Sequence, residues 1–132
     1  MSLPPAFVMA VVNRCALSVA PRRPMLDWSR PFWTREDMEG LGDEQSLYLL
    51  PTWDDEQELR QRLEERWPAI FEAELDLWCR DRELWPKPRD FAMFQAWFEL
   101  RCFPLVEDLG AEALRSFELE PGFEASVREA LG

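Results

Sequence analysis

The chain contains no histidine, so it lacks the residue that most often transfers protons near neutral pH and most often binds metal ions. A serine–histidine–aspartate triad is therefore impossible, and a cysteine nucleophile would lack its usual histidine base. No glycine-rich loop is followed by a lysine, so the sequence has no phosphate-binding loop of the P-loop type. These absences favour a protein that is not an enzyme.

Carboxylates are the remaining groups that could carry acid–base or metal chemistry. Asp76, Asp81 and Glu83 surround the end of a predicted helix, and a further carboxylate, Asp108, lies near the end of a predicted strand. Two carboxylates with different pKa values can act as acid and base, and oxygen-only metal sites also use them. These four residues are therefore an alternative active site.

The same carboxylates also have structural interpretations. The chain has 26 acidic residues, so clusters of them arise by chance. Asp76 stands four residues before Arg80, the spacing of an ordinary ion pair on a helix. Asp108 can instead accept hydrogen bonds from neighbouring backbone amides. We therefore predict neither a metal ion nor a cofactor.

A proline-rich connector supplies a second candidate site. Trp85, Lys87 and Arg89 would form an aromatic and basic patch there, of the kind that is enriched at protein interfaces. The alternative is that Trp85 folds as a lid onto the neighbouring helices. Three other tryptophans, Trp67, Trp78 and Trp97, fall at helical spacing and are predicted to lie in the core.

The charge of the chain is strongly negative and unevenly distributed. Residues 1–53 carry six acidic and five basic residues, a net charge of −1, whereas residues 54–132 carry 20 acidic and ten basic residues, a net charge of −10. Such a surface repels nucleic-acid backbones and attracts basic partners. The sequence therefore predicts a protein partner with a basic surface and no binding of nucleic acid.

The apolar segments and the cysteines indicate the compartment. The apolar run near the N-terminus stops at Asn13, well short of the roughly 20 residues that a membrane span needs, and no basic segment precedes it, as a signal peptide would require. The three cysteines are odd in number and widely spaced, which favours buried, reduced thiols. These features predict a cytoplasmic protein without membrane contact.

The apolar patterns predict an α+β fold in one domain, residues 1–132, with 1–12 and 110–132 as candidate appended termini. We expect a small, mainly antiparallel sheet of about three strands, covered on one face by three or more helices. The predicted strands are 13–20, 46–50 and 100–109. The predicted helical segments are a turn at 25–28, a helix from Asp55 that kinks or restarts at Pro68, a second segment over 68–80, a helix capped by Asp90 that carries Phe98, and a short last helix from Pro121. Residues 29–45 are predicted to form a long loop.

Several short motifs also show a resemblance to known sequences. Trp67-Pro68-Ala69-Ile70-Phe71, Leu84-Trp85-Pro86, Trp97-Phe98 and Val106-Glu107-Asp108-Leu109 occur in that order. With this pattern, residues 13–109 resemble a family of small uncharacterised bacterial proteins with no established activity. The resemblance implies a compact α+β fold and no catalytic residues. Members of that family often carry a histidine where this chain has Phe103-Pro104, so any chemistry of that histidine is absent here.

The sequence therefore predicts a non-catalytic acidic module for interaction or regulation in a bacterial cytoplasm, with homo-oligomerisation left open. A carboxylate-dependent, metal-binding hydrolase is the alternative. An inhibitor or immunity-type protein that binds a basic partner is a further alternative, because it would need the same negative charge.

Overall fold

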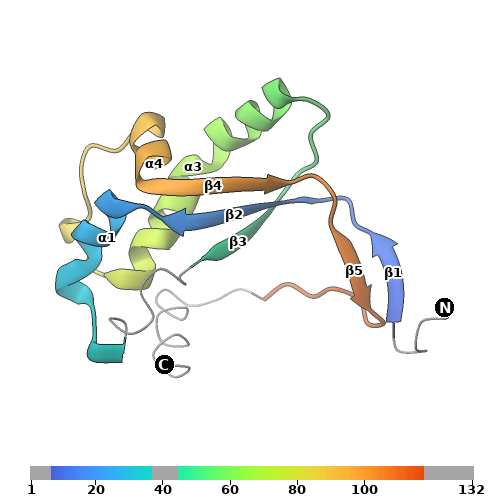
Figure 1. The fold of residues 1–132 in the computed structure, drawn as a ribbon, viewed down its shortest axis with the longest axis horizontal. Helices are drawn as coiled ribbons and strands as arrows, with labels where there is room; N and C mark the ends of the chain where they lie inside the picture. Colours follow the sequence, from blue (N-terminus) through green and yellow to red (C-terminus); the bar gives the residue numbers. More distant parts are fainter. Residues whose placement is uncertain (1–6, 37–44, 118–132) are drawn as a thin grey trace.

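The computed structural model describes residues 7–36 and 45–117 (Figure 1). The helix predicted from Pro121 and residues 37–44 of the loop predicted over 29–45 lie outside these residues. In chain order, the elements are β1 (Phe7–Val11), β2 (Cys15–Pro21), α1 (Arg23–Ser29), the 3₁₀ turn η1 (Arg30–Phe32), β3 (Ser46–Leu50), α3 (Glu56–Trp78), the 3₁₀ turn η2 (Arg82–Leu84), α4 (Phe91–Trp97), β4 (Phe98–Phe103) and β5 (Glu107–Gly110).

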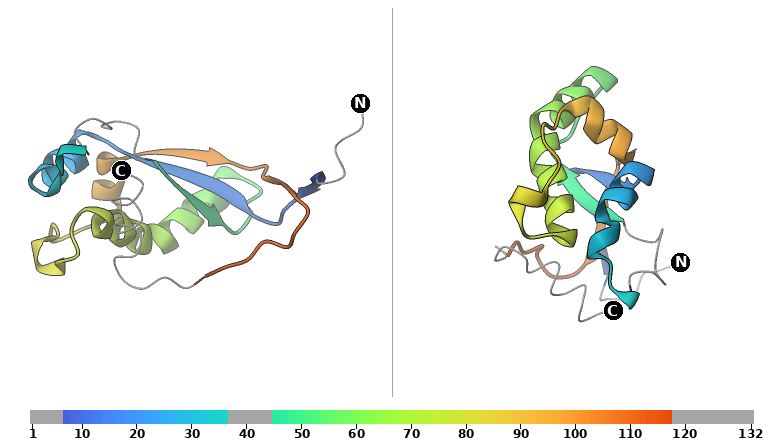
Figure 2. Two further views of the ribbon diagram at one scale, coloured as in Figure 1. Left: turned by 90° about the horizontal axis from the view of Figure 1, so that it is seen from below. Right: turned by 90° about the vertical axis from the view of Figure 1, so that its left-hand side faces the viewer.

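The described strands form two antiparallel sheets, and the α+β prediction is confirmed. The larger sheet has the order β3-β2-β4, and the smaller one pairs β1 with β5. In the larger sheet Leu17 lies opposite both Tyr48 and Cys102, which places these three residues on one face. The left view of Figure 2 shows α3 running along one side of this sheet, and no helix of the described residues lies along the other.

The strand predicted over 100–109 is in fact two strands. The larger sheet ends at Phe103, Pro104 follows, and β5 begins at Glu107, because proline cannot donate a ladder hydrogen bond. A hydrogen bond of 3.0 Å from Val12 N to Val106 O bridges the interruption. The N-terminal strand β1 is therefore paired with β5, beyond the end of the larger sheet (Figure 1), and this part of residues 1–12 is not a loose appendage.

The long helix α3 is continuous through Pro68, so the prediction that a separate segment starts there is wrong. Asp55 caps the start of α3: Glu58 N donates to Asp55 Oδ1 at 2.8 Å, and Asp54 N, one residue before the cap, donates to Glu58 Oε2 at 2.7 Å. A proline inside a helix costs about 3 kcal/mol. Leu63 before Pro68 and Ile70 and Phe71 after it are all buried in the same core cluster, and this burial offsets the cost of the proline. No described helix has the length and apolarity to cross a membrane.

Aromatic rings fill the space between α3, α4 and the sheet. Phe71 is completely buried, and its ring centroid lies 5.9 Å from that of Phe94, 5.6 Å from that of Trp97 and 5.3 Å from that of Phe98. The three tryptophans predicted for the core pack against this cluster, but each is only partly buried. The prediction for them is therefore confirmed in part, and phenylalanines supply the centre of the core.

The passage from α4 to β4 has no connecting residue. Trp97 is the last helical residue and Phe98 the first residue of the strand, so the predicted place of Phe98 on the helix is corrected. Phe98 pairs with Pro21, and Arg22 N donates to Trp97 O at 2.8 Å. The helix therefore ends where the sheet ladder begins.

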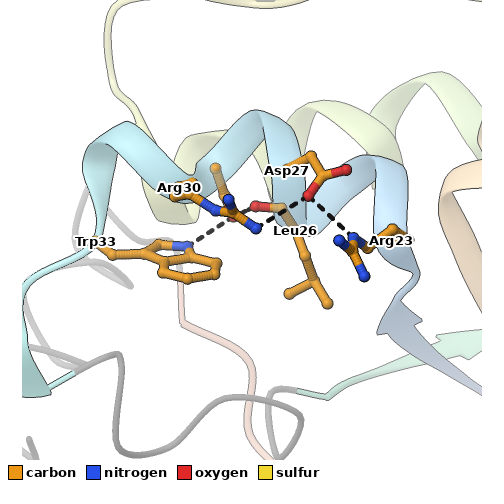
Figure 3. A network of polar contacts seen from close by, with 6 residues as sticks. Arg23, Leu26, Asp27, Arg30 and Trp33 are labelled. Atoms are coloured by element: carbon orange, nitrogen blue, oxygen red, sulfur yellow. Dashed lines mark hydrogen bonds and ion pairs between the residues drawn. The ribbon is translucent and has the colours of Figure 1, made fainter.

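The segment after β2 is fastened by side-chain contacts rather than left as a loop (Figure 3). Asp27 Oδ1 accepts from Arg23 and from Arg30, each at 3.2 Å. The buried Ser29 Oγ accepts from Trp33 Nε1 at 2.8 Å and itself donates to a carbonyl of α1. These contacts fix η1 directly against the end of α1.

One charged side chain, Glu74, is buried on the inner side of α3. Its Oε2 accepts hydrogen bonds from Tyr48 Oη at 2.6 Å and from Ser46 Oγ at 2.8 Å. A carboxylate taken out of water needs such donors. The contact therefore fastens β3 to the helix that covers it.

We expect Phe71→Ala to lower the free energy of unfolding by about 3–5 kcal/mol, because it removes a fully buried ring and leaves a cavity. Urea denaturation followed by circular dichroism measures this loss. The control is Leu114→Ala, at a strongly exposed position, which should change stability by less than about 0.5 kcal/mol. Equal effects of the two substitutions would contradict the described core.

We expect Tyr48→Phe to cost about 1.5–3 kcal/mol, since it removes a hydrogen bond to a charged group at a buried site. Urea denaturation of this variant beside Leu49→Ala, its exposed neighbour on β3, separates the hydroxyl from general effects on the strand. A Tyr48→Phe variant as stable as the wild type would show that Glu74 does not depend on this donor.

Candidate functional site

A surface pocket of about 640 Å³ lies between α3 and the connector that leads from α3 to α4. One wall belongs to α3 and the other to residues 80–85. The lining residues are Ala69, Glu72, Ala73, Asp76, Arg80, Arg82 and Trp85. The pocket thus combines two carboxylates, two guanidinium groups and one indole ring.

The wall of the pocket that α3 forms is explained by the spacing of residues along the helix. Glu72 and Asp76 are four residues apart, as are Ala69 and Ala73, so each pair lies on one side of the helix. The alanines have short side chains and leave the hollow, while the half-buried carboxylates border it.

The connector wall is fixed by Trp85, which is only 5 % exposed. Its Nε1 donates to Cys79 O at 2.7 Å. The guanidinium carbons of Arg82 and Arg89 lie 4.9 Å and 5.8 Å from the centroid of the indole ring, within the range of cation–π attraction. The burial of Trp85 agrees with the alternative in which it folds as a lid onto the neighbouring helices. The exposed side chains of the connector include Lys87 and Arg82. An interface at Trp85, Lys87 and Arg89 stays a prediction.

Charges are partly matched across the pocket. Arg82 Nη2 lies 3.8 Å from Glu72 Oε2, a loose contact for an ion pair. The pair expected between Asp76 and Arg80 is not among the ion pairs of the described residues. Asp76 therefore presents a half-buried carboxylate to the pocket.

The other candidate carboxylates are not brought to this pocket. Asp81 Oδ1 accepts from Glu83 N at 3.0 Å and begins η2, while the Glu83 side chain is exposed. Asp108 Oδ1 accepts from Gly110 N at 2.8 Å, the capping role that its sequence position allowed. Figure 1 shows β5 at the opposite end of the molecule from the connector. The four predicted carboxylates therefore do not form one active site.

The described residues include no group of three or more histidine, cysteine, aspartate or glutamate side chains that could hold a metal ion. Among the thiols, burial raises the pKa of Cys102, and the nearby Cys15 raises it further. A thiol with a raised pKa stays protonated and is a weak nucleophile.

The sequence reasoning missed Glu72 and Arg82. The missed signal is the repeated pattern Ala-x-x-Glu-Ala-x-x-Asp over residues 69–76, in which small and acidic residues recur at helical spacing on α3. Arg82 had no comparable signal, because only the fold of the connector brings it beside Glu72.

No family model, no curated protein and no solved structure matches this chain. The resemblance to the bacterial family therefore stays a prediction.

We expect Trp85→Phe to lower stability by about 1–3 kcal/mol, because the buried carbonyl of Cys79 loses its donor while the ring remains. Urea denaturation gives the value. Trp28→Phe is the control, since Trp28 Nε1 donates to Leu84 O at 3.2 Å in an exposed position, where water can replace it. A loss no greater for Trp85→Phe than for Trp28→Phe would refute the structural role of the buried hydrogen bond.

Proposed function

We propose that this protein is a non-catalytic interaction module that binds a basic partner protein, and that the pocket between α3 and the connector receives an arginine or lysine side chain of that partner. The observation that carries the proposal is the pair of half-buried carboxylates, Glu72 and Asp76, one helical turn apart on the pocket wall.

The pocket offers a cationic side chain both of the contacts that it needs. Carboxylate oxygens accept charge-assisted hydrogen bonds, which for arginine can be bidentate. The short side chains of Ala69 and Ala73 leave room for the apolar stem of the incoming residue. Glu72 already has Arg82 as a cationic neighbour, and Arg82 is held over the ring of Trp85. Asp76 is therefore the main acceptor for the incoming side chain.

The charge of the chain supports the same partner. Residues 54–132 carry a net charge of −10, and a field of this sign raises the rate of encounter with a basic surface. Salt screens such attraction over roughly 10 Å at 0.1 M. Binding of the partner should therefore weaken as salt rises.

An inhibitor or immunity-type protein is a special case of this proposal, since it differs only in what binding does to the basic partner. The reduced cysteines of the sequence support a place in a bacterial cytoplasm. A carboxylate-dependent hydrolase has less support, because Asp76, Asp81 and Asp108 have separate positions and two of them serve as caps.

The test uses Nα-acetyl-arginine amide as the probe and follows its titration into the 132-residue chain by NMR. We expect shifts of the Trp85 indole resonance and of the amides of 69–76, and we expect Asp76→Asn to weaken the affinity roughly tenfold, as loss of one charged hydrogen-bond partner implies. Glu72→Gln should weaken it less, because Glu72 already has a cationic neighbour.

The control variant is Glu64→Gln, which removes the same charge from an exposed position on α3 where Glu64 pairs with Arg60 at 2.8 Å. It should leave the affinity nearly unchanged. If Glu64→Gln and Asp76→Asn weaken binding equally, the probe senses only net charge and the pocket is not the site.

A further inference from the structure

The two edges of the three-stranded sheet differ in how they are protected. Natural edge strands avoid pairing with other chains by carrying charged residues, prolines or bulges. The edge strand β4 carries the exposed residues Glu99 and Arg101 and is followed by Pro104. The opposite edge strand, β3, reads Ser-Leu-Tyr-Leu-Leu and has neither a charge nor a proline.

The apolar side chains of β3 also point into solvent. Leu47 is 65 % exposed and Leu49 46 % exposed. They lie opposite Ser18 and Ala16 on the face of the sheet away from α3. An apolar, uncharged edge strand of this kind is an unusual feature on a chain with a net charge of −11, and it marks a surface for pairing.

We propose that β3 pairs antiparallel with β3 of a second copy of this chain and joins the two sheets into one across a two-fold axis. The strand is self-complementary when the axis passes beside Tyr48. In that register Leu47 of each copy lies opposite Leu49 of the other, so that two apolar pairs form on the open face. Such a contact is isologous, as closed dimers require.

The self-complementary register of β3, and not the charge of the chain, favours a second copy as the occupant of this edge. Two copies repel each other because each is strongly negative, so they can associate only through a surface that places no acidic residues opposite one another. The strand β3 is such a surface. A basic partner, by contrast, would gain nothing from a strand without acidic residues.

The strand is also held ready for pairing. The hydroxyl groups of Ser46 and Tyr48 both donate to the buried Glu74 on α3, and β2 pairs with β3 over its whole length. The edge is therefore already an ordered strand in one copy, and less conformational freedom is lost on association.

This inference does not depend on the proposed function, because it uses a different surface and predicts the opposite response to salt. Salt screens the repulsion between two negative copies, so self-association should strengthen as salt rises, whereas binding of a basic side chain should weaken.

The test is sedimentation equilibrium of the 132-residue chain from micromolar to millimolar concentration, at low and at high salt. We expect a monomer–dimer equilibrium that shifts toward the dimer at high salt. Leu49→Lys should raise the dimer dissociation constant roughly tenfold or more, because it places like charges near the two-fold axis. The position is exposed, and circular dichroism will establish that the variant is folded.

Two control variants test whether the effect of Leu49→Lys is specific to the β3 edge. Leu84→Lys introduces the same change at a 54 % exposed leucine of η2 and should leave the equilibrium unchanged. Phe103→Lys changes an exposed residue on the same open face, but at the β4 edge, and should also have little effect. Slower hydrogen exchange of the β3 amides at higher protein concentration would support the edge contact directly.

A protein that stays monomeric at every concentration and salt would overturn the inference. So would a dimer that Phe103→Lys weakens as much as Leu49→Lys does, because that result would mean that the open faces of the sheets pack on each other and the edges do not pair.

Discussion

The packing of α3 against the sheet is the constraint on which the rest of the structure depends. Phe71 anchors the helix among three other aromatic rings, and the residues around it then have fixed directions. Glu74 faces β3 and holds the edge strand, while Glu72 and Asp76 border the pocket on another side of the same helix. A break at Pro68 would uncouple the capped start of α3 from these residues, which explains why a continuous helix matters here.

The elements that depend on local sequence could be predicted. The limits of β3, the cap at Asp55 and the cap at Asp90 all follow from residues close together in the chain. The errors arose where distant contacts decide the outcome. Continuity through Pro68 depends on burial against the sheet, and the pairing of β1 depends on a strand almost a hundred residues later.

The candidate site, like the fold, could be predicted from the sequence only where it depends on local spacing. Asp76 was recognised from the sequence, and the spacing of the two carboxylates on α3 is visible there. The opposite wall could not be predicted, because the position of Arg82 beside Glu72 depends on how the connector folds around the buried Trp85. The sequence could not show which of the candidate carboxylates lie close together in the fold. Asp81 and Asp108 each accept a hydrogen bond from a backbone amide two residues later, and this local role is as compatible with their sequence positions as a shared site.

The direct passage from α4 into β4 has a mechanical consequence. Trp97 closes the helix and accepts from Arg22, and the next residue already belongs to the ladder with β2. No hinge separates the two elements, so the helix cannot swing or fray without pulling on the first rung of the sheet. The C-terminal half of α4 and the central strand should therefore open together as one cooperative unit, and motion in this part of the molecule must originate elsewhere.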